Sequence, residues 1–292
     1  LALEAGLPAG ALNIVAGLGE SAGAALANHP HINFMSFTGS PRVGTLVQQA
    51  TAKHFVGCTL ELGGKSPQLI FADADLDKAL PTVVKAIIQH AGQTCSAGSR
   101  ILVQKEIYNE FMAQVAELFA KVRVGTPEMD LDCGPVMNVR QQSLVDGFRT
   151  DAIKSGIELL AEGVFADGLD QNGFWVKPAL FGNVPRDHRL ACDEVFGPVL
   201  SAIPFDDELD AIRLANATDY GLVGSVWTKD GNRQQRVAKR MNCGQVFINN
   251  YGAGGGVELP FGGMKKSGHG REKGFIALEH FTTTKTIVHH HE

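Results

Sequence analysis

Apolar and polar positions alternate along the chain between short strand-like runs and longer helical stretches. Residues 12–15 predict a strand, and the glycine-rich turn and alanine-rich segment over residues 17–28 predict the helix that follows it. Residues 32–37 repeat this order, with a second helix over residues 38–53 that a Ser or Thr cap and a first-turn proline would open. A further strand-like run covers residues 55–62. Successive strand-to-helix units predict a doubly wound α/β domain.

The same alternation continues beyond Pro67. The expected strands cover residues 68–71, 101–103, 174–180, 200–205, 222–227 and 245–249, and the expected helices cover residues 75–90, 107–122, 138–154, 209–216 and 233–241. Since helices and strands still alternate, we expect a second α/β domain. No internal repeat or low-complexity linker separates the two parts.

Composition excludes several classes of protein. The 292 residues are 44% hydrophobic and 20% charged, which is ordinary for a globular protein. A net charge of −5 gives no reason to expect nucleic acid or an anionic membrane as a partner. No run of 18 apolar residues occurs, so no membrane-spanning helix is expected, and the first residues lack the basic region of a signal peptide.

The five cysteines are widely spaced and form no CxxC pair. This pattern argues against a disulfide framework or a zinc cluster and indicates a reducing compartment, so we expect a cytoplasmic protein. The histidines at residues 289–291 are either the remainder of a tag or a native tail. They have no companion ligands in the sequence, so no metal site is expected.

Cys95 has surroundings suited to a nucleophile. It follows Gly92, which ends the preceding helix, and the small residues Ser96 and Ala97 leave room for a substrate. Because the thiolate attacks carbonyl groups, the site must lower the thiol pKa, and the backbone N–H of Cys95 could face the developing oxyanion. The alternative is a packed structural cysteine, which suits the other four cysteines better. For His90, stabilisation of the helix end is favoured over a Cys–His dyad.

Glu61 is a candidate general base. It stands between Leu60 and Leu62, ahead of Gly63 and Gly64. Apolar neighbours raise a carboxyl pKa toward the operating pH, and the glycines allow backbone or cofactor to approach closely. A thiol that attacks a carbonyl and a carboxylate that activates water together suffice for acyl-thioester chemistry. The alternative is an ordinary carboxylate at the end of a surface strand.

Two glycine-rich turns compete as a phosphate-binding loop. Residues 17–23 carry glycines at a spacing that departs from the GxGxxG pattern, which makes the match weak. Residues 37–40 end a strand and open a helix, so Ser40 and free backbone N–H groups would face a pyrophosphate. Glycines that serve tight turns alone remain an alternative for both segments.

Five segments in one order carry a resemblance to a known family. They are FTGS at residues 37–40, LELGGKSP at 60–67, HAGQTCSAGSR at 90–100, EVFGP at 194–198 and PFGGMKKSG at 260–268. Together they closely resemble the motifs of the NAD(P)-dependent aldehyde dehydrogenase superfamily, from about residue 1 to about residue 285. The early part of a full-length member is absent, so we expect the chain to be a fragment.

The resemblance implies a fold and a domain division. It implies a truncated doubly wound Rossmann-like cofactor domain, then an α/β catalytic domain with a C-terminal oligomerisation strand. The expected boundaries place half of the dinucleotide-binding domain at residues 1–63, the thiol domain at 64–266, and a return segment with the strand and tail at 267–292. Residues 281–288, which are strand-like, resemble the family's interface strand and imply a homodimer or homotetramer.

The resemblance also implies roles for individual residues. Cys95 would be the nucleophile and Glu61 the general base. Ser40 would contact the pyrophosphate, Val43 and Gly19 the adenine, and Glu194 the hydroxyls of the nicotinamide ribose. The full set of implied cofactor-binding residues is Gly19, Gly39, Ser40, Val43, Gly44, Leu62, Gly63, Gln141, Glu194 and Phe196, with Phe196 walling the nicotinamide ring and Gln141 touching its ribose. Residues 249–258 would line the aldehyde tunnel, or form a solvated loop.

The activity implied is oxidation of an aldehyde to a carboxylic acid with NAD or NADP, through a thiohemiacetal and a thioester on Cys95. We expect this chain by itself to bind the cofactor weakly and to turn over slowly. Three other functions stay open. A relative that acylates coenzyme A is disfavoured by Glu61, and a cysteine hydrolase lacks a His or Asn partner near Cys95. A non-catalytic subunit that acts through its oligomer interface is the third.

Overall fold

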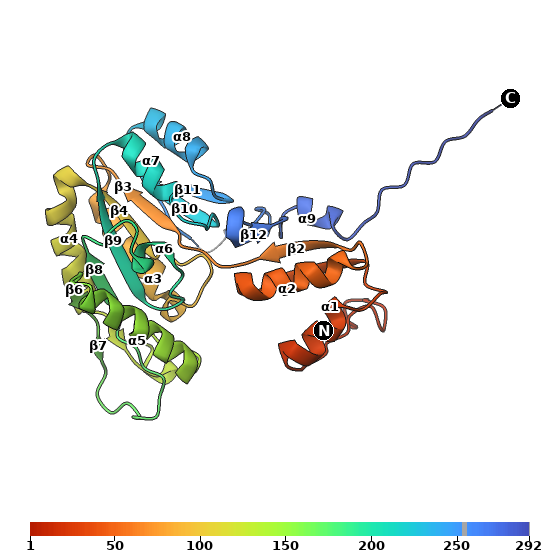
Figure 1. Cartoon of the computed structure of the whole chain (residues 1–292), viewed down its shortest axis with the longest axis horizontal. Helices are drawn as coiled ribbons and strands as arrows, with labels where there is room; N and C mark the ends of the chain where they lie inside the picture. The colour runs from red at the N-terminus through yellow and green to blue at the C-terminus, as the bar shows by residue number, and fades with distance from the viewer. Residues whose placement is uncertain (253–255, 292) are drawn as a thin grey trace.

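A small sheet carries the first part of the chain. In the computed structural model, which describes residues 1–252 and 256–291, this sheet contains β1 (Phe34–Thr38), β2 (Gly57–Glu61) and β12 (Gly268–His269) in the order β1-β2-β12. β1 and β2 run parallel, whereas the late strand β12 pairs antiparallel with β2. The sheet and its helices α1 (Ala24–Ala27) and α2 (Pro41–Ala52) lie to one side of the rest of the molecule (Figure 1).

A larger sheet organises the second part. Its seven strands have the order β11-β10-β3-β4-β9-β8-β6, and all neighbours pair parallel except β6 with β8. The strands are β3 (Pro67–Ile70), β4 (Arg100–Gln104), β6 (Glu158–Glu162), β8 (Ala179–Gly182), β9 (Val199–Phe205), β10 (Val223–Trp227) and β11 (Gln245–Ile248). A separate parallel pair joins β5 (Arg123–Val124) to β7 (Val164–Phe165). This is the α/β architecture that the sequence predicts.

Helices pack against the large sheet through apolar faces. They are α3 (Leu76–Ile88), α4 (Lys105–Ala120), α5 (Val139–Lys154), α6 (Arg189–Cys192), α7 (Glu208–Asn216) and α8 (Gly231–Arg240), and the short α9 (Ile276–Glu279) follows β12. Phe111, Val115 and Phe119 of α4 repeat at the four-residue spacing of one helix face and are completely buried. Their burial explains why the periodicity of this segment predicts a helix.

Helix starts follow the caps expected from the sequence. Ser40 accepts a hydrogen bond from the N–H of Val43, and Pro41 occupies the first turn of α2. Asp75 caps α3 in the same way through the N–H of Lys78. These two capped starts fix the ends of the loops that lead from β1 into α2 and from β3 into α3.

Two predicted strands are wrong, wholly or in part. Residues 12–15 form no strand, and Ile14 and Val15 are 89% and 80% exposed. The expected strand at residues 174–180 begins only at Ala179, directly after Pro178, which has no N–H to donate to a sheet. Residues 281–288, expected as an interface strand, form no strand in the single chain and run away from the body of the molecule (Figure 1). In each case the local pattern was strand-like, but a strand also needs a hydrogen-bonding neighbour.

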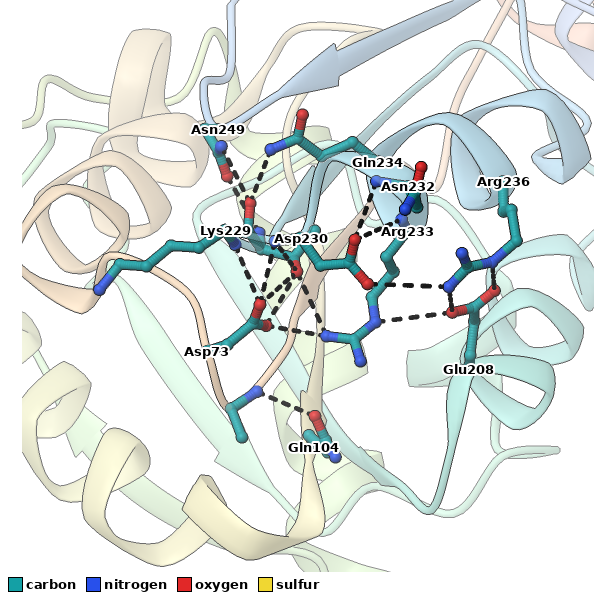
Figure 2. A network of polar contacts seen from close by, with 12 residues as sticks. Asp73, Gln104, Glu208, Lys229, Asp230, Asn232, Arg233, Gln234, Arg236 and Asn249 are labelled. Carbon is teal, nitrogen blue, oxygen red and sulfur yellow. Dashed lines mark hydrogen bonds and ion pairs between the residues drawn. The ribbon is translucent and has the colours of Figure 1, made fainter.

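A polar network closes the carboxyl ends of three strands of the large sheet (Figure 2). Asp73, just beyond β3, accepts hydrogen bonds from the Thr228 hydroxyl, the backbone N–H groups of Lys229 and Asp230, and the Arg233 guanidinium. Asn249, just beyond β11, bonds to both backbone groups of Thr228. Ligands in doubly wound sheets usually bind at the carboxyl ends of the strands. Here that edge is occupied by internal hydrogen bonds, whereas the candidate residues Glu61 and Cys95 lie at the opposite edge.

Candidate active site

The two sheets meet where Glu61 ends β2 and where β3 and β4 begin. Cys95 lies in the turn between the 3-10 segment η2 (Gln89–Gly92) and β4. Gly64, on the link from β2 to β3, touches this turn so closely that a Cβ there would lie 2.3 Å from the Cys95 carbonyl oxygen. The site therefore combines the carboxyl end of the small sheet with the amino ends of the large one.

The turn that carries Cys95 is held in a demanding conformation. His90, Ala91 and Gly92 have φ values of 53°, 52° and 68°, all in the left-handed region. A side chain on Gly92 would collide with Gly197, since its Cβ would lie 2.2 Å from that carbonyl oxygen. His90 itself is exposed, which supports the interpretation that it belongs to the helix end.

Two side chains hold this turn to neighbouring elements. The Gln93 amide donates to the His90 carbonyl (3.2 Å) and accepts from the N–H of Met137 (2.8 Å). The Tyr251 hydroxyl, just beyond β11, donates to the Ser96 carbonyl at 2.6 Å. The cysteine is thus fixed on both sides by hydrogen bonds to the backbone of its own turn.

The Cys95 thiol is half-buried, so it is open to a reactant. Burial raises its pKa, and the nearby carboxyl groups of Glu194 and Glu61 raise it further, while the backbone N–H groups of Ser96 and Cys95 lower it. The expectation that the site lowers the thiol pKa is therefore wrong for the protein without ligands. The reason is first the burial of the thiol, and second that the neighbouring charged groups Glu194 and Glu61 are acidic rather than basic.

Glu61 is an unpartnered buried carboxyl group. The residue is 2% exposed, and neither carboxyl oxygen has a hydrogen-bond partner among the described residues. Burial raises its pKa to about 8, with a further contribution from Glu272 and an opposing one from Arg271. A carboxyl group in this state is a competent base slightly above neutral pH. Gly262 lies against it, because a Cβ there would come within 2.8 Å of the Glu61 Oε1.

Glu194 lies over the peptide that links the two sheets. The Gly64 N–H donates to its Oε1 at 3.0 Å, and a Cβ on Gly63 would lie 2.2 Å from its Oε2. Burial raises the Glu194 pKa, whereas the Gly64 N–H and the Lys65 ammonium lower it. A side chain at residue 63 would collide with the Glu194 carboxylate, so only glycine is compatible with this arrangement.

Phe196 and Gln141 are joined to each other. Phe196 has φ 53°, and the Gln141 amide nitrogen donates to the carbonyls of Phe196 (2.7 Å) and Val195 (3.1 Å). The Gln141 N–H groups are therefore used to fix the backbone beside Phe196. This is a positioning contact that the sequence did not indicate.

The remaining cofactor candidates lie on the small sheet and its helices. Gly19 and Val43 line one groove of about 520 Å³ between α1, α2 and β1, together with Phe37 and Leu46. Gly39 and Ser40 lie at the amino end of α2, where the Ser40 hydroxyl caps the helix. Gly44 and Leu62 pack on each other, since a Cβ on Gly44 would lie 2.7 Å from the Leu62 side chain. Their contact seats α2 closely on β2.

Three supporting residues were missed although each lies in a segment with a recognised motif. Arg100 donates to the carbonyls of Lys65, Leu214 and Ala215. The Ser267 hydroxyl donates to the Gly63 carbonyl at 2.6 Å and accepts from the Gly221 N–H at 2.9 Å. Lys65 is completely buried beside Gly64. In the sequence, each of these polar residues lies beside or near the glycines of its motif, and this position could have pointed to it.

Other kinds of site find no support in the part of the chain that the structure describes. No group of three or more His, Cys, Asp or Glu side chains is arranged to hold a metal ion there. No described helix is long and apolar enough to cross a membrane. Of the expected tunnel loop at residues 249–258, residues 253–255 lie outside the described residues.

Comparison with known proteins gives one consistent family. Residues 1–287 match the model described as "Aldehyde dehydrogenase family". An aldehyde dehydrogenase of Emericella nidulans is 42% identical over 97% of this chain and 57% of its own length. Phenylacetaldehyde dehydrogenase of Pseudomonas fluorescens is 41% identical over 99% of this chain and 57% of its own length. The chain thus spans less than three fifths of these curated relatives.

Solved structures agree. A Burkholderia cenocepacia protein assigned to the aldehyde dehydrogenases superimposes with a TM-score of 0.96 and 59% identity, covering 98% of this chain and 60% of its own. Betaine aldehyde dehydrogenase of Staphylococcus aureus, in complex with NAD+, gives a TM-score of 0.90 and 35% identity, covering 95% of this chain and 55% of its own.

Proposed function

The chain belongs to the aldehyde dehydrogenase family, and from this premise we propose that its full-length protein oxidises an aldehyde to a carboxylic acid with NAD+ or NADP+. One observation carries the proposal. Cys95, in the turn before β4, and the unpartnered base Glu61, at the end of β2, are held at a single junction, because Gly64 on the link after Glu61 packs against the Cys95 carbonyl. That pairing supplies both the nucleophile and the water-activating group.

The residues around the junction fit a dinucleotide. The groove lined by Gly19 and Val43 offers an apolar surface for adenine, and the amino end of α2 at Ser40 offers N–H groups for phosphate. Glu194, seated over Gly63, would accept hydrogen bonds from ribose hydroxyls. A nicotinamide ring bound there supplies a hydride acceptor. The NAD+ complex of the staphylococcal relative supports this assignment.

Gly39, Gly44, Leu62, Gln141 and Phe196 complete the proposed cofactor site. Gly44 and Leu62 would act through their packing, which sets the distance between α2 and β2. Gln141 would act by fixing the backbone of Phe196, whose ring we propose as a wall beside the nicotinamide.

The acylation half of the reaction uses Cys95. Its thiol gives up a proton, for which the nearby Glu61 carboxylate is an acceptor, and the sulfur adds to the aldehyde carbonyl. The backbone N–H groups that face the thiol would donate hydrogen bonds to the developing oxyanion. Loss of a hydride from the resulting thiohemiacetal, which a bound oxidised nicotinamide would accept, leaves a thioester on Cys95.

The hydrolytic half uses Glu61. Glu61 first releases to solvent the proton that it took from the thiol. As a carboxylate it then takes a proton from a water molecule, whose oxygen adds to the thioester. The C–S bond breaks, and Glu61 passes this proton to the leaving Cys95 sulfur, which gives a carboxylic acid and the thiol. Because Glu61 activates water for hydrolysis of the thioester, transfer of the acyl group to coenzyme A is disfavoured. No contact in the described residues favours the non-catalytic alternative.

The oligomeric state remains a proposal. Residues 281–288 expose Phe281, Ile287 and Val288 to 79%, 72% and 86%, so these apolar side chains are available for contact with a second copy. We propose that this segment pairs with a second copy to form a homodimer or homotetramer. Light scattering on the full-length protein tests it, and a monomer would contradict it.

The experiment that tests the proposed activity compares the wild-type full-length protein with Cys95→Ala and, as a control, Cys133→Ala. We expect acid formation that depends on NAD+ or NADP+ in the wild type and in Cys133→Ala, and loss of more than about 1,000-fold in Cys95→Ala. Acyl-CoA as the product, or full activity without Cys95, would overturn the proposal.

A further inference from the structure

The Tyr251 hydroxyl joins the chain beyond β11 to the turn that carries Cys95. It donates to the Ser96 carbonyl at 2.6 Å, across 155 positions of the sequence. The Tyr251 side chain is half-buried, and a tyrosine hydroxyl removed from water usually has a hydrogen-bond partner. Here that partner is the carbonyl of the residue directly after the proposed nucleophile.

Cys95 and Ser96 are the two central residues of a tight turn. The Ala97 N–H donates to the Thr94 carbonyl at 3.0 Å, which closes the turn. Among the residues that the structure describes, the N–H groups of Cys95 and Ser96 bond to no backbone carbonyl. Both remain available as donors to negative charge on the sulfur or on the oxygen of a carbonyl that the sulfur attacks.

The peptide between Cys95 and Ser96 is the part of this turn whose direction needs to be fixed. Tight turns of types I and II differ by a rotation of about 180° of the central peptide, which reverses its N–H and its C=O. Gly64 lies against the Cys95 carbonyl, since a Cβ there would come within 2.3 Å of the oxygen, and Tyr251 holds the Ser96 carbonyl. The two contacts together keep the Ser96 N–H on the side of the thiol.

Tyr251 is itself fixed by the large sheet. Asn249 has φ 49°, and its side chain bonds to both backbone groups of Thr228 at 3.0 and 3.1 Å. The Tyr251 ring lies beside the ring of Phe247 in β11, with 6.0 Å between the ring centroids. The hydroxyl is therefore presented to Ser96 by residues anchored on β10 and β11.

We propose that Tyr251 is a positioning residue that holds the peptide between Cys95 and Ser96 with its N–H toward the reacting sulfur and carbonyl oxygen. The proposal rests on the proposed function, in which Cys95 adds to an aldehyde. Negative charge develops on the carbonyl oxygen when sulfur adds and again when water adds, and donors that are already oriented stabilise this charge without reorganisation. In this role Tyr251 acts through the Ser96 carbonyl and not by contact with the aldehyde.

The test compares the full-length wild-type protein with Tyr251→Phe and with Tyr108→Phe. Tyr108 is a matched control, because its buried hydroxyl, on α4, accepts a hydrogen bond from the Asn183 N–H at 2.7 Å. For Tyr251→Phe we expect kcat to fall about 10-fold with the KM for aldehyde changed less than about twofold. Tyr108→Phe should keep wild-type kinetics, and thermal unfolding measures the stability lost in each variant.

A second measurement does not depend on the proposed reaction. Iodoacetamide alkylates thiolates, and peptide mass spectrometry follows its adduct on Cys95 from about pH 6 to about pH 10. N–H groups that face the sulfur favour the thiolate, whereas the neighbouring Glu61 and Glu194 disfavour it and are retained in Tyr251→Phe. We expect alkylation about threefold slower near neutral pH in Tyr251→Phe, with its pH profile moved to higher pH. A turn that was merely loosened would expose the thiol and react faster.

The possible results separate the inference from the proposed function. An unchanged kcat in Tyr251→Phe, alkylation that is unchanged or faster, or equal losses in Tyr108→Phe would overturn the inference. If Tyr251→Phe does not fold, Phe247→Leu, which keeps the hydroxyl but loosens its ring contact, should change both rates in the same direction, and unchanged rates would overturn it. A wild-type protein that oxidises no aldehyde would overturn the proposed function, and the alkylation profile would still decide whether Tyr251 orients the N–H groups.

Discussion

Burial affects the pKa values of the residues at the junction more than direct contacts do. Glu61 has no hydrogen-bond partner among the described residues, and its pKa of about 8 follows first from burial. The flanking leucines in the sequence indicated this environment correctly. Lys65 gave no such indication, because a lysine between a glycine and a serine is usually exposed. Its burial depends on the packing of β4, α7 and β10 around it, which the local sequence does not reveal.

The pKa of Glu61 predicts a pH dependence of turnover. The base must be deprotonated to activate water, so kcat at saturating substrates should rise through about pH 8 and level off above it. Steady-state rates of the full-length protein from about pH 6 to about pH 10 measure this. A kcat that is flat, or that falls across this range, would contradict the base role.

The same pKa shift predicts that the stability of the fold falls with pH where kcat rises. The folded protein retains a proton on Glu61 between about pH 4.5 and about pH 8 that the unfolded chain has lost, so this group makes stability fall as the pH rises through that window. Glu61→Gln should therefore raise the unfolding temperature by a few degrees above pH 8 and leave it unchanged near pH 4. Equal unfolding temperatures above pH 8 would show that Glu61 is not buried as described.

At the scale of elements, the sequence predicts helices better than strands. A helix forms its backbone hydrogen bonds within its own segment. Caps such as Ser40 and Asp75 and the apolar spacing of α4 were therefore enough to predict these helices from the sequence. Residues 12–15 and 281–288 have the composition of strands but pair with no strand among the residues that the structure describes. Whether a strand forms depends on its partner, and the local pattern contains no information about that partner.

The network around Asp73 predicts a measurable contribution to stability (Figure 2). Asp73→Ala would remove the acceptor of the Lys229 N–H, and it would leave the Asp230 N–H and the Arg233 guanidinium with weaker contacts to the Thr228 hydroxyl. We expect a loss of about 2 kcal/mol in the free energy of unfolding, measured by urea denaturation. Asp206→Ala, which removes an exposed ion pair with Lys105, is the control and should cost less than about 0.5 kcal/mol. Equal losses in the two variants would show that the network is not what closes this edge.

At the scale of the whole molecule, the site depends on how the two sheets face each other. The order of the motifs indicated that residues 61 and 95 act together. It did not indicate that the carboxyl end of β2 lies next to the amino ends of β3 and β4. The chain passes between the sheets at Gly63 and Gly64 and returns to the small sheet in β12. We propose the division at residues 1–63, 64–266 and 267–292 on this basis.

The central claim is that Cys95 carries the acyl group and Glu61 releases it. Full-length Glu61→Gln protein, incubated with an aldehyde and NAD+ or NADP+, should accumulate an acyl adduct that peptide mass spectrometry places on Cys95, whereas wild-type protein should show little. An adduct on another cysteine, or rapid release of acid by the Glu61→Gln protein, would contradict the account.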